Sequence, residues 1–352
     1  MNETLQETTL PLLAYQGRDL RRIFAARGYP PFRGSQVQQW LRRSGVLQWE
    51  EMHNLPQELI TEAQTALPLG TIPPRTVEQS TDGTKKYLFP TRNGGLVETA
   101  LIPEEHRVTL CISTQVGCRR SCTFCQTARQ GFQGNLEVDE IINQYHSVPE
   151  RREITNIVYM GMGEPLDNLS ATLGSIAVFT EQEGYQLPPR RITVSTVGIH
   201  PALEEFLTTE FEAGPPSLAV SLHNPFPEER RQLMPVENGN PIEETVRLLR
   251  SNREDTRRRI SFEYTLFAGY NDTKRHVDGI ARLLNGLRIR INLIPFHTIP
   301  GVQLAPAGME QLEWFRDQLR RKDIPTFIRR SRGQDINAAC GLLWTRNKTV
   351  SP

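Results

Sequence analysis

The chain has 352 residues, enough for two average domains or for one large α/β barrel with an appendage. Hydrophobic residues make up 38% and charged residues 23%, as in an ordinary soluble enzyme, and 41 basic against 40 acidic residues leave a net charge of +1. Bulk charge alone therefore predicts no nucleic-acid binding, and no apolar run approaches the roughly 20 residues that a membrane helix needs.

The N-terminal segment MNETLQETTLPLL lacks the basic and apolar regions of a signal peptide. We therefore expect a cytoplasmic protein, in which thiols stay reduced. Five cysteines in that setting indicate metal or redox chemistry rather than a framework of structural disulfides.

Residues 1–70 have a helical pattern and form the first predicted unit. Short amphipathic segments are expected at 17–27, 34–44, 50–52 and 56–66. Seven arginines but only one acidic residue, Asp19, lie between Arg18 and Arg43. Solvated helix faces would explain any one such cluster. Two further arginine-dense stretches, at 250–259 and 316–332, favour RNA contact, and the unit is expected to be an RNA-binding accessory domain.

Residues 71–106 change to short segments that are typical of strands. Strands are expected at 75–79, 85–89 and 97–102. Asp82-Gly83 and Asn93-Gly94-Gly95 supply the hairpin turns between them. We expect a small β-extension that links the helical unit to the rest of the chain.

Between residues 107 and 330, apolar strands alternate with helices. The expected strands lie at 108–113, 154–160, 192–195, 218–222, 260–266 and 289–294, with a short last strand at 326–329. The expected helices lie at 138–145, 169–180, 201–207, 242–251, 274–284 and 309–322. Such alternation favours parallel strands with right-handed crossovers. The fold class is therefore α/β, with six strands forming a partial (β/α)6 barrel and residues 331–352 following as a C-terminal segment.

Polar residues follow four of these strands. They are Gly161-Met162-Gly163-Glu164, Ser195-Thr196, Ser221 with His223, and His297. Ordinary loop polarity explains each of them alone. In barrels and open α/β sheets, however, active sites are built where the strands end. Four such points on the rim that also carries a cysteine-rich loop predict an active site there.

That loop contains Cys118, Cys122 and Cys125, spaced C-x3-C-x2-C. A zinc site normally has four ligands in two close pairs; no second C-x2-C is present, so His106 or His146 would have to complete one. A disulfide is disfavoured in a reducing compartment. An iron–sulfur cluster suits thiolates in a tight loop, and three cysteines leave one iron open to a substrate or cofactor.

The C-x3-C-x2-C loop, with Phe124 before its last cysteine, resembles the radical S-adenosylmethionine (SAM) superfamily. A more specific resemblance, to the RlmN/Cfr family of RNA adenosine methyltransferases, covers nearly the whole chain. Its motifs here are TLCISTQVGC, TARQGF, NLEVDEI, VYMGMGEPLDN, ITVSTVG, AVSLH, INLIP and RRSRGQDINAACG, with FRGSQVQQW, MHNLP and STDGTKKYLF nearer the N-terminus. GFQGNL and the N-terminal match are closer to the RlmN type, which methylates C2 of adenine.

The resemblance implies a radical SAM barrel whose 4Fe–4S cluster is held by Cys118, Cys122 and Cys125, with two molecules of SAM used per turnover. One methylates Cys340 by ordinary displacement. The second is cleaved reductively to a radical that removes hydrogen from the S-methyl group. The methylene radical adds to an electron-poor adenine carbon, and Cys111 then attacks the sulfur of Cys340 to release the product through a transient disulfide.

Further roles follow from the same resemblance. Glu98, in LVETALIP, matches the carboxylate that removes the ring proton. Gly163 and Glu164 match the turn that receives the methionyl amine. Other cofactor contacts are implied for Ser195, Ser221, Leu222, His223 and His297. His297 stands where the family commonly has asparagine and Gly134 where it has arginine, and either change can alter RNA grip or site selection.

The implied activity is methylation of adenosine C2 in 23S rRNA and, by extension, in tRNA. The expected protein is a cytoplasmic monomer with flavodoxin or ferredoxin as its electron donor. A Cfr-like enzyme would methylate C8 with the same cysteines. A non-catalytic RNA-binding paralogue is disfavoured by the five cysteines and Glu98, and a radical enzyme for a peptide or small molecule is disfavoured by the arginine-rich unit.

Overall fold

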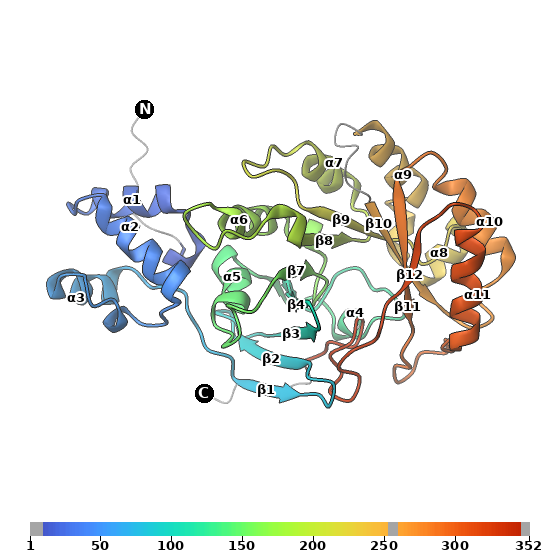
Figure 1. Cartoon of the computed structure of the whole chain (residues 1–352), viewed down its shortest axis with the longest axis horizontal. Coiled ribbons are helices and arrows are strands. Elements are labelled where there is room, and N and C mark those ends of the chain that lie inside the picture. Colours follow the sequence, from blue (N-terminus) through green and yellow to red (C-terminus); the bar gives the residue numbers. More distant parts are fainter. Residues whose placement is uncertain (1–9, 253–259, 346–352) are drawn as a thin grey trace.

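The protein is built around one ten-stranded sheet with helices packed around it (Figure 1). The computed structural model describes residues 10–252 and 260–345. The sheet order is β1 (Thr76–Gln79), β2 (Lys85–Pro90), β3 (Leu96–Glu104), β4 (Arg107–Cys111), β7 (Asn156–Tyr159), β8 (Ile192–Thr196), β9 (Ser217–Ser221), β10 (Ile260–Leu266), β11 (Ile289–Pro295) and β12 (Thr326–Ile328). A separate pair is formed by β5 (Gln115–Val116) and β6 (Gly134–Asn135).

The barrel part of the sheet is parallel. The six predicted strands are present as β4 and β7 to β11, and each pairs in parallel with its neighbour in the sheet. β12 adds a seventh parallel strand beside β11. The strand β10, ISFEYTL, alternates apolar with polar residues, and six of its seven residues are buried, so both of its faces are covered. The predicted α/β fold with an incomplete barrel is confirmed.

The three strands β1, β2 and β3 are antiparallel, and they are continuous with the barrel because β3 pairs with β4. Gly83 and Gly94 have φ of 86° and 75° in the turns that join these strands. One cross-strand row runs through Lys86 on β2, Ala100 on β3 and Cys111 on β4. The extension therefore carries side chains toward the same face as one of the predicted catalytic cysteines.

Among the described residues, helices precede the first strand and fill the connections between the later strands. They are α1 (Gly17–Ala26), α2 (Phe32–Gln39), α3 (Gln57–Ala66), α4 (Gln126–Gln130), α5 (Val138–His146), α6 (Leu169–Thr180), α7 (His200–Thr208), α8 (Pro227–Leu233), α9 (Ile242–Ser251), α10 (Lys274–Leu283) and α11 (Met309–Arg320). Apolar periodicity did not predict α4 and α8. α8, PEERRQL, is mostly charged and α4 is only 5 residues long, so neither carries a repeated apolar spacing. The described part of the chain contains no helix with the length and apolar character needed to cross a membrane.

The N-terminal helices pack directly on the barrel. Leu20 of α1 belongs to the same apolar core as the barrel residues. The N–H of Gly17 donates to the Glu181 carboxylate at 2.7 Å, and His146 Nε2 lies 2.9 Å from the Val46 carbonyl oxygen. Removing residues 1–70 would therefore uncover part of the core. Substitutions of exposed arginines are the better test of RNA contact by this unit.

One arginine of the N-terminal cluster has a structural role. Arg42 is 2% exposed, and its Nη2 donates to the carbonyls of Leu13 and Tyr15, both at 2.9 Å. Its guanidinium also lies over the ring of Tyr185 at 4.9 Å from the centroid. This side chain is unavailable to RNA.

We expect Arg42→Ala to lower the free energy of unfolding by about 2–4 kcal/mol, because two buried carbonyls lose a charged donor. The neighbouring Arg43 is exposed, and Arg43→Ala should change the free energy of unfolding by no more than about 0.5 kcal/mol. Urea denaturation of both variants measures the difference. Equal midpoints would contradict the structural role.

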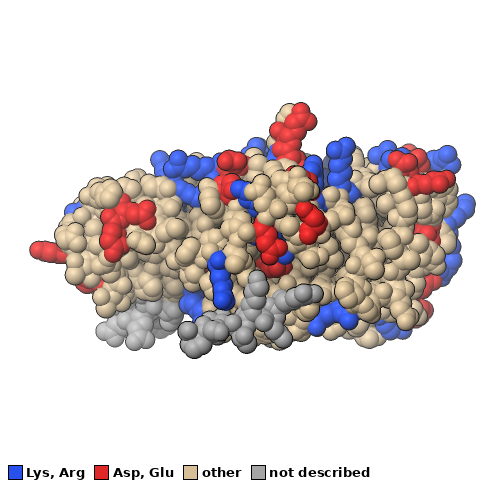
Figure 2. Space-filling view, turned by 90° about the horizontal axis from the view of Figure 1, so that it is seen from below, with Lys and Arg blue, Asp and Glu red and all other residues tan. Residues whose placement is uncertain are grey.

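On the face shown in Figure 2, basic and acidic side chains are interspersed among uncharged ones. Arg18, Arg22 and Arg43 are exposed on the N-terminal unit. Of the predicted cluster at 250–259, residues 253–259 lie outside the described part of the chain, and Arg250 donates to the carbonyls of Leu283 and Asn285.

Candidate active site in the barrel

The three cysteines of the loop line one cavity at the ends of the barrel strands. Cys118, Cys122 and Cys125 all border this space of about 160 Å³, here called the loop cavity. The loop follows β5 and ends at Cys125, which is the residue before α4. Phe124 holds the loop against the barrel, because its ring packs on that of His223 with centroids 4.8 Å apart.

The loop cavity suits a positively charged metal group. Burial raises the pKa of Cys118 to about 12, and it raises the pKa of Cys122 and Cys125 above the usual value. Cys125 also raises the pKa of Cys118 and of Cys122, and Cys118 raises that of Cys122, because two thiolates repel each other. Deprotonated thiolates in such a place need a cation beside them, which iron ions would supply.

A zinc site does not fit. Among the described residues, no three His, Cys, Asp or Glu side chains are placed to hold one metal ion. Both ring nitrogens of His146 are already engaged, by the Tyr185 hydroxyl at 2.8 Å and the Val46 carbonyl at 2.9 Å, and His106 lies exposed beside Glu105. Three thiols grouped around one cavity, but too far apart for a single ion, suit a cluster in which each binds a different iron.

Gly163 and Glu164 form a tight turn on the wall of the loop cavity. Gly163 has φ of 98°, and a Cβ there would lie 2.6 Å from the side chain of Gln115, so only glycine fits. The Glu164 carboxylate accepts the N–H groups of Leu166 at 3.0 Å and Val197 at 2.9 Å. Burial raises the pKa of Glu164 to about 7, while hydrogen bonds from Thr196 and from the N–H groups of Val197 and Leu166 oppose that shift. The site thus offers a buried carboxylate suited to an ammonium group.

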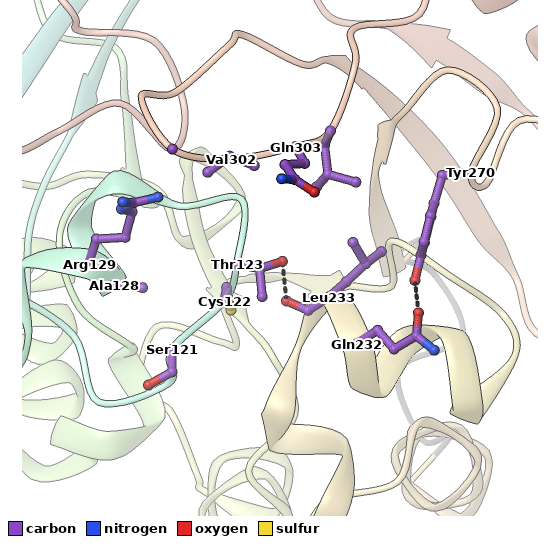
Figure 3. A pocket seen from close by; sticks show the side chains of 12 residues that line it. Ser121, Cys122, Thr123, Ala128, Arg129, Gln232, Leu233, Tyr270, Val302 and Gln303 are labelled. Atoms are coloured by element: carbon purple, nitrogen blue, oxygen red, sulfur yellow. Dashed lines mark hydrogen bonds between the residues drawn. The ribbon is translucent and has the colours of Figure 1, made fainter.

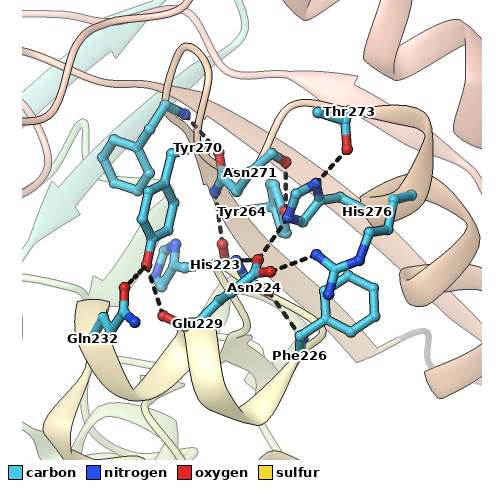
Figure 4. Close-up of polar contacts among 12 residues, drawn as sticks. His223, Asn224, Phe226, Glu229, Gln232, Tyr264, Tyr270, Asn271, Thr273 and His276 are labelled. Carbon is cyan, nitrogen blue, oxygen red and sulfur yellow. Dashed lines mark hydrogen bonds and ion pairs between the residues drawn. The ribbon is translucent and has the colours of Figure 1, made fainter.

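His223 is positioned by a buried polar network behind the same cavity (Figure 4). The N–H of Thr265 donates to His223 Nδ1 at 3.0 Å, and Asn271 Nδ2 donates to the His223 carbonyl at 2.7 Å. These contacts hold the backbone of His223 in a left-handed conformation, with φ of 53°. Burial lowers the pKa of His223 to about 3, so its ring is neutral. Ser195 and Ser221 line the cavity beside it.

Leu222 does not line the loop cavity. Its side chain is fully buried, and its backbone is used within the fold. The Leu222 N–H donates to the Glu263 carbonyl at 3.0 Å, and the Leu222 carbonyl accepts from Arg230 at 3.1 Å. A backbone contact from Leu222 to a cofactor stays a prediction.

Cys111 and Cys340 line a second, larger cavity of about 690 Å³, here called the barrel cavity. Cys111 ends β4 and Cys340 belongs to the C-terminal segment, so the fold brings together two residues far apart in the sequence. Cys340 also lines the loop cavity, which places it between the two spaces. Both are free thiols. Burial raises the pKa of Cys111 to about 12, and Arg329 opposes that shift.

Glu98 lies beside these cavities rather than on their walls. It is 5% exposed on β3, with Oε1 3.2 Å from Lys86 Nζ and Oε2 accepting the Trp344 N–H at 2.7 Å. Burial raises the pKa of Glu98, while Lys86 and the Trp344 N–H oppose the shift. Its role in removing a proton stays a prediction.

The two departures from the family pattern have different settings. His297 lines both cavities, and its Nε2 lies 2.6 Å from the Ser331 hydroxyl. Gly134 lies in β6 opposite Val116, and a Cβ there would meet no atom within 4 Å. Packing therefore does not require glycine at position 134, and the effect of Gly134 on RNA binding stays a prediction.

Sequence reasoning missed a charged pair inside the barrel. Glu263 and Arg329 line both cavities, with Arg329 Nη1 3.4 Å from Glu263 Oε2, and Asn292 donates to Glu263 Oε1 at 2.8 Å. The signal was present, because Glu263 is a charged residue in the middle of β10, on the face that alternates with its apolar residues. A carboxylate at such a position is costly unless it is paired, so it marks a polar interior.

A third cavity, of about 580 Å³, lies on the other side of the cysteine loop (Figure 3). Cys122 lines both this space and the loop cavity. Thr123 fastens the loop here, since its N–H donates to the Leu233 carbonyl at 2.9 Å. The Tyr270 hydroxyl donates to Gln232 at 3.0 Å on the opposite wall. Cys122 is thus the loop cysteine placed between the interior site and this outer cavity.

Two family models match the chain. The model of the radical SAM superfamily matches residues 112–284, which include the cysteine loop and most of the barrel. The model described as the ribosomal RNA large subunit methyltransferase N-terminal domain matches residues 10–65, which are the N-terminal helices.

Curated relatives are similar over almost the whole chain. A probable dual-specificity RNA methyltransferase RlmN of Porphyromonas gingivalis is 46% identical, covering 97% of this chain and 96% of its own length. The dual-specificity RNA methyltransferase RlmN of Desulfotalea psychrophila is 41% identical over 92% of this chain and 91% of its own. A crystal structure of a radical SAM methyltransferase from Sphaerobacter thermophilus is 37% identical, with a TM-score of 0.90 over 95% of this chain and 99% of that chain.

Proposed function

Since the chain belongs to the RlmN family of RNA methyltransferases within the radical SAM superfamily, we propose that it makes 2-methyladenosine in 23S rRNA and in tRNA. The observation that carries this proposal is the placement of Cys340, which borders both the loop cavity and the barrel cavity that holds Cys111. A sulfur in that position can meet a cofactor on one side and a target base on the other.

The cofactors of the family are a 4Fe–4S cluster and SAM, which together supply a carbon radical when an electron arrives. In this chain Cys118, Cys122 and Cys125 would hold the cluster, because their buried thiols border one cavity. Gly163 lets a ligand approach the backbone, and Glu164 offers its buried carboxylate to the ammonium of SAM. Ser195, Ser221, His223 and His297 line the same cavity and would complete the contacts.

Cys340 carries the methyl group in the proposed mechanism, and Cys111 releases the product. The Cys111 thiolate attacks the Cys340 sulfur, forming an S–S bond and breaking the bond from sulfur to the transferred carbon. The electron pair of the broken bond goes to that carbon, which takes up a proton from water and stays on the base as a methyl group. An external thiol would then reduce the disulfide before the next turnover. Burial disfavours a Cys111 thiolate, so the nearby Arg329 guanidinium has a role in making it available.

Glu98 is proposed to take the proton that leaves the ring carbon, as a general base. Its carboxylate is held beside the Cys340 segment through the N–H of Trp344. Because Glu98 contacts the segment that carries Cys340, it would take the proton at the stage when the product is released from Cys340. An external flavodoxin or ferredoxin would supply the electron, and the site of action would be the cytoplasm, where ribosomal RNA is located.

The N-terminal helices are proposed to bind the RNA. Arg18, Arg22 and Arg43 are exposed there, and guanidinium groups suit phosphate contacts. The resulting affinity would fall steeply as salt increases.

Nucleoside mass spectrometry tests the activity. We expect 2-methyladenosine to appear in 23S rRNA and tRNA when the chain is expressed in a host that lacks its own enzyme, and to be absent with Cys340→Ala. Appearance of 8-methyladenosine instead would assign the Cfr-like reaction. Absence of any methyladenosine, with no SAM cleavage by the reconstituted protein, would favour a non-catalytic RNA-binding paralogue.

A further inference from the structure

The segment that carries Cys340 is held down on the β-extension by a pattern of polar contacts. In Figure 1 the C-terminal segment, in red, runs beside β1 and β2. The Gly333 N–H donates to Asp82 Oδ2 at 2.9 Å, and the Ser80 hydroxyl donates to Asp335 Oδ1 at 2.6 Å. These contacts fix the start of the segment. They do not reach Cys340 itself.

A buried pair holds the segment on both sides of Cys340. Lys86 Nζ donates to the carbonyl of Ile336 at 2.6 Å, and it lies 3.2 Å from Glu98 Oε1. Glu98 Oε2 accepts the N–H of Trp344 at 2.7 Å. Ile336 precedes Cys340 by four positions and Trp344 follows it by four. The Lys86–Glu98 pair thus connects the two ends of the short stretch that presents the sulfur.

The sheet register explains why this pair lies next to the cysteines. Lys86 is directly opposite Ala100, and Ala100 is directly opposite Cys111, so the three share one row and one face. Ala338 packs against Ala100 and Cys111 on that face. The segment therefore covers the row, with the Lys86 ammonium at its outer end and Cys111 nearer the barrel.

We propose that Lys86 is a positioning residue for the reaction, one that holds Glu98 and the Cys340 segment together so that Cys340 faces Cys111. The proposal rests on the proposed function above for the roles of Glu98 and the two cysteines. Glu98 engages both Lys86 and the Trp344 N–H in this arrangement. A proton taken up by Glu98 removes the negative charge that attracts Lys86 and weakens both contacts, so proton removal and release of the Cys340 segment are coupled.

The charges around the pair are few. Lys86 is 8% exposed and also lies 3.4 Å from Glu78 Oε2, across the β1–β2 register. Glu98 meets the Trp344 N–H from the C-terminal segment, and its own backbone N–H donates to the sulfur of Met162 at 3.4 Å. Lys86 is thus the cation that pairs with Glu98 among the described residues, which makes its removal a specific test.

The experiment compares Lys86→Met, Lys86→Arg and Lys85→Met in the cluster-loaded full chain. Lys85 is a matched control, because it is the adjacent lysine on β2 and pairs with Glu150 instead. Hydrogen exchange followed by mass spectrometry reports on residues 333–345, and turnover on RNA gives kcat and KM. We expect Lys86→Met to speed exchange of that segment and lower kcat, each by about 10-fold or more, because a buried charged donor is lost. KM should stay within about 3-fold of the wild-type value.

Lys86→Arg should restore slow exchange and most of kcat, and Lys85→Met should behave as wild type. Unchanged exchange of residues 333–345 in Lys86→Met overturns the proposal, and so does faster exchange that Lys86→Arg fails to reverse. If Lys86→Met does not fold, the double variant Lys86→Met with Glu98→Gln removes both charges, and only hydrogen exchange is measured on it. A wild-type exchange rate for residues 333–345 in the double variant overturns the proposal. Failure of the nucleoside test would instead refute the proposed function and leave the exchange result standing.

Discussion

Replacing Cys111 by serine is expected to stop turnover with the RNA still joined to the protein. In the proposed mechanism the transferred carbon bridges Cys340 and the adenine until a second thiolate attacks the sulfur. Serine at position 111 cannot form the S–S bond, so the bridge stays. About one RNA per chain should accumulate as a covalent complex, and free 2-methyladenosine should not appear.

Denaturing electrophoresis with labelled RNA measures this complex, because a covalent bridge survives heat and detergent. The matched control is Cys111→Ser with Cys340→Ala, in which no sulfur can carry the carbon and no complex should form. The geometry supports the expectation, since both thiols line the barrel cavity. Normal turnover by Cys111→Ser would show that another group releases the product.

Glu164→Gln is expected to weaken SAM binding roughly 10- to 100-fold, the loss typical of one charge-assisted hydrogen bond. Glu164 is buried, lines the loop cavity and accepts two backbone N–H groups. Its carboxylate would be the anion that meets the amine of the cofactor. Glutamine keeps the size of the side chain and removes the charge.

The same residue predicts how binding depends on pH. Burial raises the pKa of Glu164 to about 7 in the protein without ligand, so the carboxyl is largely protonated at pH 6. An ammonium ligand binds the ionised form, and affinity should therefore rise as pH increases from 6 to 7.5. Burial lowers the pKa of His223 to about 3, so its ring stays neutral across this range, and burial also lowers the pKa of His297.

Equilibrium dialysis of SAM with the oxidised, cluster-loaded protein, after Cys340 has been methylated, checks both expectations. Neither methyl transfer nor reductive cleavage then consumes SAM. Wild type should show the rise with pH, and Glu164→Gln should bind weakly with little change across the range. Thermal unfolding of the two proteins shows whether the variant is folded. Equal affinity at pH 7.5 would mean that Glu164 does not contact the amine.

Much of the barrel could be predicted from the sequence because its elements carry strong local signals. The strand at Ile260–Leu266 and the helices at Leu169–Thr180 and Ile242–Ser251 were predicted with the bounds that the structure shows. Apolar runs and regular apolar spacing depend only on neighbouring residues. The charged helix α8 and the short helix α4 lack those signals, and their placement depends on the loops around them.

Some functional residues also carry a local sequence signal, and others do not. The spacing of Cys118, Cys122 and Cys125 is a local pattern, so the cysteine loop was visible at once. The roles of Cys111, Cys340 and Glu98 came from a family resemblance, because no spacing in the sequence connects them. Glu263 and Arg329 were missed, although a glutamate in the middle of a predicted barrel strand was a usable signal.

By itself, the sequence determined the order of the barrel strands, the cysteine loop and the turn at Gly163, because each depends on residues close together in the chain. Only the tertiary structure decided that Arg42 is buried, that Cys340 lies between two cavities and that Lys86 holds its segment. Burial and pairing depend on which distant segments pack together. In this protein the register of β2, β3 and β4 decides the row in which Lys86 and Cys111 meet, and no local pattern encodes that row.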